Sequence, residues 1–430
     1  MASQPIPSSI LIVGSGVFGL STAYSLSQNP SFANTRITLL DRSAFPSPDG
    51  ASIDSSRIVR SDYADYAYAD LALRALREWR KPEWQDVYHE TGLALIVNHD
   101  DTLDGGNGEA GREYMRKSME NVRRLGLSDE KGDIQVLRSR KDIEGVVNTG
   151  GGSEATGKVA ATGRVEFVHA AISRLLFAKS SGASTNDLVE GVELADGSIM
   201  KADLTILATG AWTPKFLDLR GITSATGQIL AYTELSAAEQ EMYGKNPTLM
   251  NESTGMFIIP PQGRVLKVAR HGYGYGNPTQ IPNPENPSET ITVSLPRTKQ
   301  DDPNLWIPPE GLQACRHALA EMIPALKDRP FTYSRICWYT DTPKGDWIVS
   351  YHPRYKGLFV ATGGSGHGYK FLPVIGDEIV KCVVGETPEA FREKWAWPTR
   401  QTEDHISTDD WRGGRKGMIL DEELGKGSRL

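Results

Sequence analysis

Residues 9–19 read SILIVGSGVFG, and a segment of helical character, LSTAYSLSQ, follows directly. An apolar strand that breaks into G-x-G-x-x-G and then into a helix is the pattern of a dinucleotide-binding unit. Gly14 permits the tight turn, Gly16 lets the backbone approach a pyrophosphate, and Gly19 lets helix and strand pack closely. A second apolar strand ends in Asp41, about twenty residues beyond the last glycine, where a carboxylate binds ribose hydroxyls. The stretch therefore predicts a Rossmann-like domain that holds a dinucleotide, in preference to a βαβ unit without a ligand.

A second glycine-rich stretch lies near the other end of the chain. Residues 335–373 read RICWYTDTPKGDWIVSYHPRYKGLFVATGGSGHGYKFLP, in which the apolar strand 358–362 breaks into a glycine turn and Lys370 enters a predicted helix. This order brings backbone N–H groups against a ligand, which we interpret as a flavin. Residues 202–212, ADLTILATGAW, form a buried strand that ends either against the cofactor's phosphates or in a plain core turn.

Composition narrows the class of protein. The 430 residues suffice for two domains or one large composite, and 39% hydrophobic residues supply the core of a soluble globular protein. A formal charge of −7 without a Lys/Arg-rich block argues against nucleic-acid binding. Three widely spaced cysteines indicate neither a disulfide framework nor a metal site, so we expect a reducing compartment. The apolar run 10–13 is too short for a membrane span, and no basic region precedes it as in a signal peptide.

The chain ends in Ser428-Arg429-Leu430, a conservative variant of the Ser-Lys-Leu peroxisomal address. The alternative is a chance match in a polar tail. An oxidase that makes peroxide would favour the address, and we expect a monomer in the peroxisome or the cytoplasm.

Other segments predict a mixture of helices and strands from their apolar spacing and turn residues. They are a helix over 165–178, a hairpin over 189–199 that turns at 195–198, strands over 92–97, 255–260 and 264–271, a surface excursion over 277–308, and a tail over 395–430 that wraps the fold or is partly disordered.

Several polar side chains allow two interpretations. Alternation along strand 264–271 places Lys267 among small and apolar neighbours, so this lysine is either partly buried or faces water from an edge strand. Arg57 and Arg60 flank two β-branched residues and could be two surface arginines. A tyrosine cluster, at a predicted helix start, either lines a roomy pocket or lies on the surface: Tyr63, Tyr66 and Tyr68.

Six motifs occur in a fixed order: GSGVFG at 14–19, SSRIVRSDY at 55–63, ATGAW at 208–212, RVLKVARHG at 264–272, RICWYTDT at 335–342 and ATGGSGHGYKFLP at 361–373. Together they resemble the sarcosine-oxidase and fructosyl-amino-acid-oxidase (amadoriase) group of FAD-dependent amine oxidases, in the D-amino-acid-oxidase superfamily. The resemblance spans nearly the whole chain. It implies an α/β plus α+β architecture, in which a Rossmann-like FAD-binding domain is interleaved with a mixed-sheet substrate domain.

The resemblance also implies domain limits and a set of cofactor contacts. The FAD-binding domain would take 1–90, 150–224 and 335–390, the substrate domain 91–149 and 225–334, and the tail 391–430. The implied FAD contacts are Gly14, Gly16, Val17, Phe18, Gly19, Asp41, Ser56, Arg57, Cys337, Gly364, Gly366, Gly368 and Lys370.

Roles in the chemistry follow from the same resemblance. Cys337 matches the cysteine that bonds covalently to the 8α-methyl of FAD, and Lys267 matches a lysine near flavin N5, where a cation stabilises charge as O₂ is reduced. Arg57 and Lys370 match the pair that grips the substrate carboxylate. Other residues around the substrate, matched to the sarcosine-oxidase branch, are His271, Tyr339 and His367.

The implied reaction is oxidation of an N-substituted amino acid, of N-methyl, pipecolate, saccharopine or fructosyl type, to an imine with release of H₂O₂. A flavin dehydrogenase that passes electrons to a protein or quinone is an alternative, against which Lys267 argues. A non-catalytic flavin-binding scaffold is another, because the family's strand of type GVxFxTG is missing from the expected place between 178 and 189. The motifs mix features of the sarcosine and amadoriase branches, so the substrate stays open.

Overall fold

A six-stranded sheet is built around the first glycine motif in the computed structural model, which describes residues 5–44, 47–97, 108–127, 162–179, 187–400 and 412–426. Its order is β17-β18-β8-β1-β2-β4, and all neighbours are parallel except the antiparallel pair β17 and β18. The strands are β1 Ser9–Val13, β2 Arg36–Asp41, β4 Val165–His169, β8 Leu204–Leu207, β17 Ile348–Tyr351 and β18 Leu358–Thr362.

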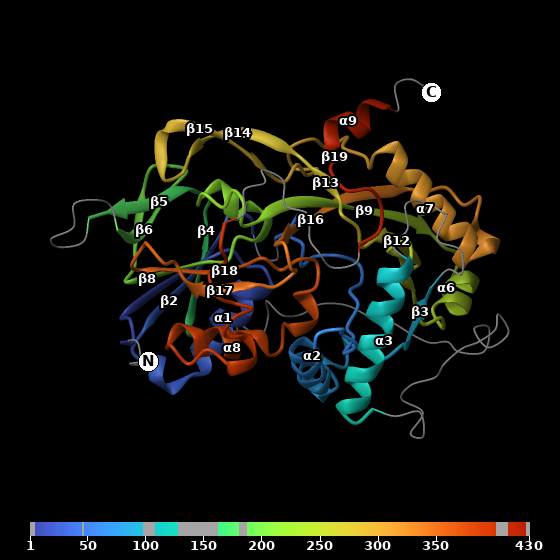
Figure 1. Cartoon of the computed structure of the whole chain (residues 1–430), viewed down its shortest axis with the longest axis horizontal. Coiled ribbons are helices and arrows are strands. Elements are labelled where there is room, and N and C mark those ends of the chain that lie inside the picture. Colours follow the sequence, from blue (N-terminus) through green and yellow to red (C-terminus); the bar gives the residue numbers. More distant parts are fainter. Residues whose placement is uncertain are drawn as a thin grey trace.

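Alternate side chains of β1 point to opposite faces of this sheet. Ile10 and Ile12 join the core formed with helices α1 (Val17–Gln28) and α8 (Ile375–Val383), whereas Leu11 and Val13 join the core of the opposite face. Figure 1 shows α1 and α8 together below the sheet. Burial on both faces explains why β1 reads as a continuous apolar run.

A second, eight-stranded sheet of mixed direction forms the other half of the molecule. Its order is β19-β13-β9-β12-β11-β10-β3, and β16 pairs with β9 outside this path. The strands are β3 Leu93–Ile96, β9 Ser224–Glu234, β10 Thr248–Asn251, β11 Met256–Gln262, β12 Val265–Arg270, β13 Tyr275–Gly276, β16 Tyr333–Asp341 and β19 Met418–Ile419. Helix α7 (Pro309–Met322) covers one face, where it packs on Leu266 and Val268 of β12.

Smaller elements complete the described chain. They are helices α2 Tyr66–Trp79, α3 Gly108–Arg124, α6 Ala237–Tyr243 and α9 Leu420–Gly425, strands β5 Ile172–Ala178, β6 Leu188–Leu194, β7 Ile199–Lys201, β14 Pro278–Asn283 and β15 Asn286–Ser294, and short 3-10 helices at Pro30–Phe32, Pro82–Trp84, Gly210–Lys215, Pro324–Leu326, Tyr369–Phe371 and Glu389–Phe391. None of the described helices is both long and apolar enough to cross a membrane.

The structure confirms most predicted strands. These are β1 and β2 around the first motif, β3, β8, the hairpin β6–β7, and the pair β11–β12. Lys267 lies on β12, which is flanked by β9 and β11, and its side chain is buried. The interpretation of an edge-strand lysine that faces water is therefore wrong.

The helix predicted over 165–178 is wrong, because this segment forms β4 and β5. Strand β4 pairs with β2 at the sheet edge, and β5 pairs with β6. The pairing of β4 with β2 joins segments far apart in sequence, whereas β5 and β6 are consecutive strands. Both pairings override the helix-like apolar spacing. Strand β4, with Val165-Glu166-Phe167-Val168, occupies the edge position next to β2. Residues 180–186, within the segment where the GVxFxTG strand was expected, lie outside the described residues.

Two segments predicted as irregular contain ordered structure. The excursion over 277–308 includes the hairpin β14–β15, which reaches across the top of the six-stranded half in Figure 1. Within the predicted tail, Trp395 is fully buried, and residues 412–426 return to the eight-stranded sheet through β19. The final Ser-Arg-Leu lies outside the described residues.

Candidate functional site

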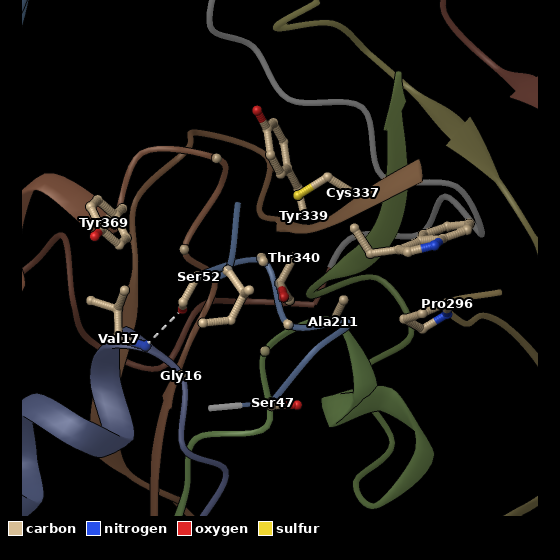
Figure 2. A pocket seen from close by; sticks show the side chains of 18 of the residues that line it. Gly16, Val17, Ser47, Ser52, Ala211, Pro296, Cys337, Tyr339, Thr340 and Tyr369 are labelled. Atoms are coloured by element: carbon tan, nitrogen blue, oxygen red, sulfur yellow. Dashed lines mark hydrogen bonds between the residues drawn. The ribbon is translucent and has the colours of Figure 1, made fainter. Parts of the chain in front are cut away.

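A cavity of about 710 Å³ is lined by residues of both sheets. Figure 2 shows Cys337 and Tyr339 on one strand and Val17 at the start of a helix among the residues around it. Most of the predicted site residues line the cavity: Gly14, Gly16, Val17, Phe18, Asp41, Arg57, Lys267, His271, Cys337, Tyr339, Gly364, Gly366, His367, Gly368 and Lys370. Gly19 and Ser56, also predicted, do not line it.

The first glycine turn has the shape that a dinucleotide requires. Gly14 has φ +103°, and a Cβ there would lie 2.4 Å from the carbonyl oxygen of Ala208. A Cβ at Gly16 would meet nothing closer than Ser52 Oγ at 3.6 Å, so this position faces open cavity. The first turn of α1 carries no acidic residue, and its amides and helix dipole favour a phosphate there.

The carboxylate of Asp41 holds the glycine turn in place. Its Oδ2 accepts hydrogen bonds from the backbone N–H of Ser15, at 2.8 Å, and from Ser15 Oγ, at 2.7 Å. The cavity is also lined by the residues that follow β8, Ala208, Thr209 and Gly210, as expected for a strand that ends against the cofactor. These features fit the dinucleotide half of FAD.

Cys337 lies in the middle of β16 and is a buried free cysteine. Tyr339, two residues further along, lies on the same face of the strand, and both side chains line the cavity. Burial raises the pKa of the Tyr339 phenol above its ordinary value, so the ring stays uncharged. The wall formed by β16 therefore presents a thiol and a neutral phenol to the cavity.

Lys267 is a buried lysine on β12, which belongs to the same sheet as β16. Its Nζ lies 2.9 Å from Asp54 Oδ2 and donates to the backbone oxygen of Ser56 at 2.5 Å. Burial lowers the pKa of Lys267 to about 8, although Asp54 opposes this effect. The lysine is therefore held in one pose with a counterion beside it.

Asp54 is a site residue that the sequence analysis missed. Its carboxylate accepts hydrogen bonds from Lys267, Arg57 and Tyr232, the last at 2.6 Å. Burial alone would raise the pKa of Asp54, but the charges of Lys267 and Arg57 outweigh it, and the pKa lies well below its ordinary value. The sequence could have indicated this role, because Asp54 stands three residues before the first arginine of the SSRIVRSDY motif.

The two arginines of that motif differ in what they contact. Arg57 donates to Asp54 and to backbone oxygens of its own loop, those of Ala51, Ile53 and Ser56. Arg60 lines the cavity, and its Nη1 lies 2.7 Å from Asp62 Oδ2. Burial and then the charge of Arg60 hold the pKa of Lys370 well below its ordinary value. Arg60 Cζ and Lys370 Nζ also have a common neighbour, since they lie 5.9 and 4.9 Å from the centroid of the Tyr63 ring.

A chain of hydrogen bonds connects Lys370 to His367. Lys370 Nζ donates to the hydroxyl of Tyr63 at 2.7 Å, and that hydroxyl lies 3.1 Å from His367 Nδ1. His367 Nε2 lies 2.8 Å from the carbonyl oxygen of Gly345, which can only accept, so Nε2 carries the proton and Nδ1 accepts from Tyr63. Burial lowers the pKa of His367 to about 3, so the ring is neutral. Both ring nitrogens of His367 therefore form hydrogen bonds within the protein, and through these bonds His367 fixes the positions of Tyr63 and Lys370.

His271 lines the cavity, and Arg412, which does not line it, lies with its Cζ 5.7 Å from the centroid of the Tyr339 ring. The rings of His271 and Tyr339 are 5.9 Å apart, and burial, followed by the charge of Arg412, lowers the pKa of His271 well below its ordinary value. Arg412 Nη2 donates to Asp341 at 3.3 Å and to the backbone oxygen of Ser365 at 3.1 Å. Arg412 was missed because its segment carries no strand or helix pattern.

Of the three tyrosines in the predicted cluster, the structure buries Tyr63 and Tyr68 and leaves Tyr66 exposed. Tyr68 stacks near Tyr63, with ring centroids 5.8 Å apart, and neither side chain lines the cavity. The two tyrosines lie behind Lys370 and His367 and stiffen that wall.

Comparisons with known proteins agree with this geometry. The family model of FAD dependent oxidoreductases, DAO, matches residues 9–381. L-saccharopine oxidase of Schizosaccharomyces pombe is 31% identical over 423 residues, which cover 94% of this chain and 95% of that protein. Monomeric sarcosine oxidase of Bacillus sp. strain NS-129 is 24% identical, covering 88% of this chain and 93% of its own.

Among solved structures, a modified fructosyl peptide oxidase from Aspergillus nidulans superposes with a TM-score of 0.78 at 25% identity, covering 97% of this chain and 98% of that one. The resemblance found in the motifs is thus confirmed, as are the architecture of two interleaved sheets and the FAD cofactor. The chain belongs to the DAO family of FAD dependent oxidoreductases.

Proposed function

We propose that this protein oxidises the secondary amine of an N-substituted amino acid and uses O₂ as the electron acceptor. One observation carries the proposal: a single cavity brings the glycine turns of both FAD motifs together with Cys337, Lys267 and the cations Arg60 and Lys370. The similarity to oxidases of saccharopine and sarcosine supports the same substrate class.

FAD, when bound, accepts two electrons from the carbon next to nitrogen and passes them to O₂. Lys370 and Arg60 hold the substrate carboxylate, in place of the pair of Lys370 and Arg57 that the sequence predicts. The reason is that Arg60 lies beside Lys370: Arg60 Cζ and Lys370 Nζ are 5.9 and 4.9 Å from the centroid of the same ring, that of Tyr63. A carboxylate bound between Arg60 and Lys370 would supply a negative charge that favours the protonated form of Lys370, so that its hydrogen bonds are charge-assisted on both sides. It would also fix the amine relative to the ring.

The cavity favours the uncharged amine that oxidation requires. Arg60, Lys267 and Lys370 line it, and its walls are largely apolar. Low dielectric and neighbouring cations both disfavour an ammonium, so the bound amine loses its proton more easily than in water. Neutral His271 and Tyr339 provide hydrogen-bonding groups beside it without adding charge.

We further propose that Cys337 tethers FAD covalently, that the protein is a monomer, and that Ser428-Arg429-Leu430 directs it to the peroxisome. A peroxide-producing reaction supports the last point, because peroxisomes contain such oxidases.

A peroxide-coupled screen of the holoenzyme tests the function. We expect H₂O₂ release with at least one of sarcosine, N-methyl aromatic amino acids, pipecolate, saccharopine and fructosyl amino acids. Dimethylamine, which lacks the carboxylate of sarcosine, serves as the matched control and is expected to give none. If these amines reduced the flavin without air but released no peroxide in air, the protein would be a dehydrogenase, and the proposal would be wrong.

Cys337→Ser tests the tether. We expect the wild type to keep its yellow flavin in the acid-precipitated protein, and the variant to release all of it into the supernatant. Cys382→Ser, at a buried cysteine on α8 outside the cavity, is the control and should behave as the wild type. Flavin that stays with precipitated Cys337→Ser would assign the bond to another residue.

A further inference from the structure

A buried carboxyl lies behind Arg60. Glu252 follows β10 in the chain, and its exposed fraction is 0%. Neither Oε1 nor Oε2 has a hydrogen-bond partner within the described part of the chain. Arg60 Nη1 lies 3.7 Å from Oε1, which is beyond hydrogen-bond distance. Buried polar groups are nearly always hydrogen-bonded, so a carboxyl in this state requires an explanation.

The backbone of Glu252 is fixed from two sides. Its N–H donates to the carbonyl oxygen of Ile96, at the end of β3, at 2.8 Å. On the other side a Cβ at Gly111 of α3 would lie 2.7 Å from the carbonyl oxygen of Glu252, so helix and turn are in close contact. The carboxyl is therefore held at its distance from Arg60 by the packing of β3 and α3.

Arg60 lies between two acids of different burial. Its Nη1 contacts Asp62 Oδ2 at 2.7 Å, and its Nη2 donates to Tyr114 at 3.2 Å. The Asp62 side chain is 17% exposed and that of Glu252 is 0% exposed. Burial raises the pKa of Glu252 to about 8, Asp62 adds to the effect, and Arg60 opposes it. At neutral pH the guanidinium therefore has one charged partner, Asp62, and Glu252 is an uncharged acid.

We propose that Glu252 is a positioning residue for Arg60, and that its proton controls whether Arg60 is available to a carboxylate in the cavity. Uncharged Glu252 leaves the guanidinium where it lines the cavity. Ionised Glu252 attracts the guanidinium from 3.7 Å away and competes with the ligand for it. This inference rests on the proposed function, because it takes Arg60 as a ligand of the substrate carboxylate.

The test compares the wild-type holoenzyme with Glu252→Gln, which has the same shape and cannot ionise. The probe is (methylthio)acetate, a carboxylate whose thioether sulfur cannot ionise, and its Kd is measured from the change in flavin absorbance across neutral and alkaline pH. Lys267, with a pKa also about 8, adds a pH effect common to both proteins. The compared quantity is therefore the ratio of the wild-type Kd to the variant Kd.

We expect this ratio to be constant below pH about 8 and to rise above it, by at most about tenfold per pH unit, because only the wild type gains the competing charge. The matched control is Glu241→Gln, where an exposed glutamate on α6 lies at the same 3.7 Å from a cation, Lys245. Its Kd should follow the wild type at every pH. If Glu252→Gln does not fold, Glu252→Met, apolar and of similar length, replaces it.

A ratio that stays constant across the pH range would overturn the role of Glu252. The Kd of the probe in Arg60→Met then shows whether only the role of Glu252 is wrong, or whether the proposed carboxylate site is wrong as well. If Arg60→Met weakens the probe while the ratio is constant, Arg60 binds the carboxylate and Glu252 does not control it. If Arg60→Met leaves the Kd unchanged, the carboxylate site itself is wrong, and the inference fails with it.

Discussion

Lys267→Met is expected to slow the reoxidation of substrate-reduced flavin by O₂ about 10²–10³-fold, the range seen when a fixed charge stabiliser is removed from an active site. The ammonium is buried, and Asp54 and Ser56 fix it at the cavity wall. Reduction of O₂ builds negative charge in a volume from which water is excluded, so a fixed cation is worth far more there than in water. Stopped-flow mixing of the reduced enzyme with O₂ measures the effect directly.

The same variant should leave reduction of the flavin by substrate nearly unchanged, because the proposed ligands of the carboxylate are Arg60 and Lys370. Its fold should persist, since Asp54 keeps hydrogen bonds from Arg57 and Tyr232 after Lys267 is lost. Lys381→Met, at a half-exposed lysine on α8 paired with Glu378, is the control. Unchanged reoxidation in Lys267→Met would refute the oxygen-activating role, and equal losses in both half-reactions would indicate general damage to the site.

Gly19→Ala is expected to destabilise the protein by about 3 kcal/mol and to prevent FAD binding. A Cβ at this position would lie 1.8 Å from the carbonyl oxygen of Gly14, a backbone atom that cannot move aside alone. Alanine improves intrinsic helix propensity by about 1 kcal/mol, which the steric effect exceeds. Thermal unfolding and the flavin content of the purified protein measure the two consequences.

Gly16→Ala is the matched comparison within the same turn. Gly16 has φ −71°, which alanine adopts freely, and its Cβ would meet only Ser52 Oγ at 3.6 Å. We expect the apoprotein to be as stable as the wild type, with FAD binding weakened because the methyl group occupies the approach of the pyrophosphate. Equal stability of Gly19→Ala and the wild type would mean that α1 can shift away from β1, against our expectation.

The local sequence pattern correctly predicted those helices and strands that belong to a recognisable motif or show a regular alternation of side chains. The strand, turn and helix around Gly14 and the alternation on β12 both appear as expected. The segment 165–178 failed because its conformation is decided by pairing with β2 and β6, and apolar spacing does not show such pairing. A sequence shows which residues are apolar more clearly than which strand lies beside them.

The sequence predicted the type of site and many of its residues, but not the individual contacts that these residues make. The motifs placed Cys337, Lys267 and Lys370 at one cavity, and they do line it. They did not show which acceptors Arg57 and Arg60 contact, because only the folded loop provides those acceptors. Glu252 belongs to no motif, and its meeting with Arg60 depends on two segments nearly 200 residues apart in the chain.

The strand order of the six-stranded sheet sets a condition on the synthesis of this protein. Strand β1 lies between β2 and β8, and β8 lies between β1 and β18, so the centre of the sheet needs residues 204–207 and then 358–362. While the chain is still emerging from the ribosome, β1 has an unpaired edge until β8 is made, and β8 until β18 is made. Contacts this distant in sequence also form slowly. Flavin can therefore load only after nearly the whole chain has been translated, and the unfinished chain depends on protection of those edges until then.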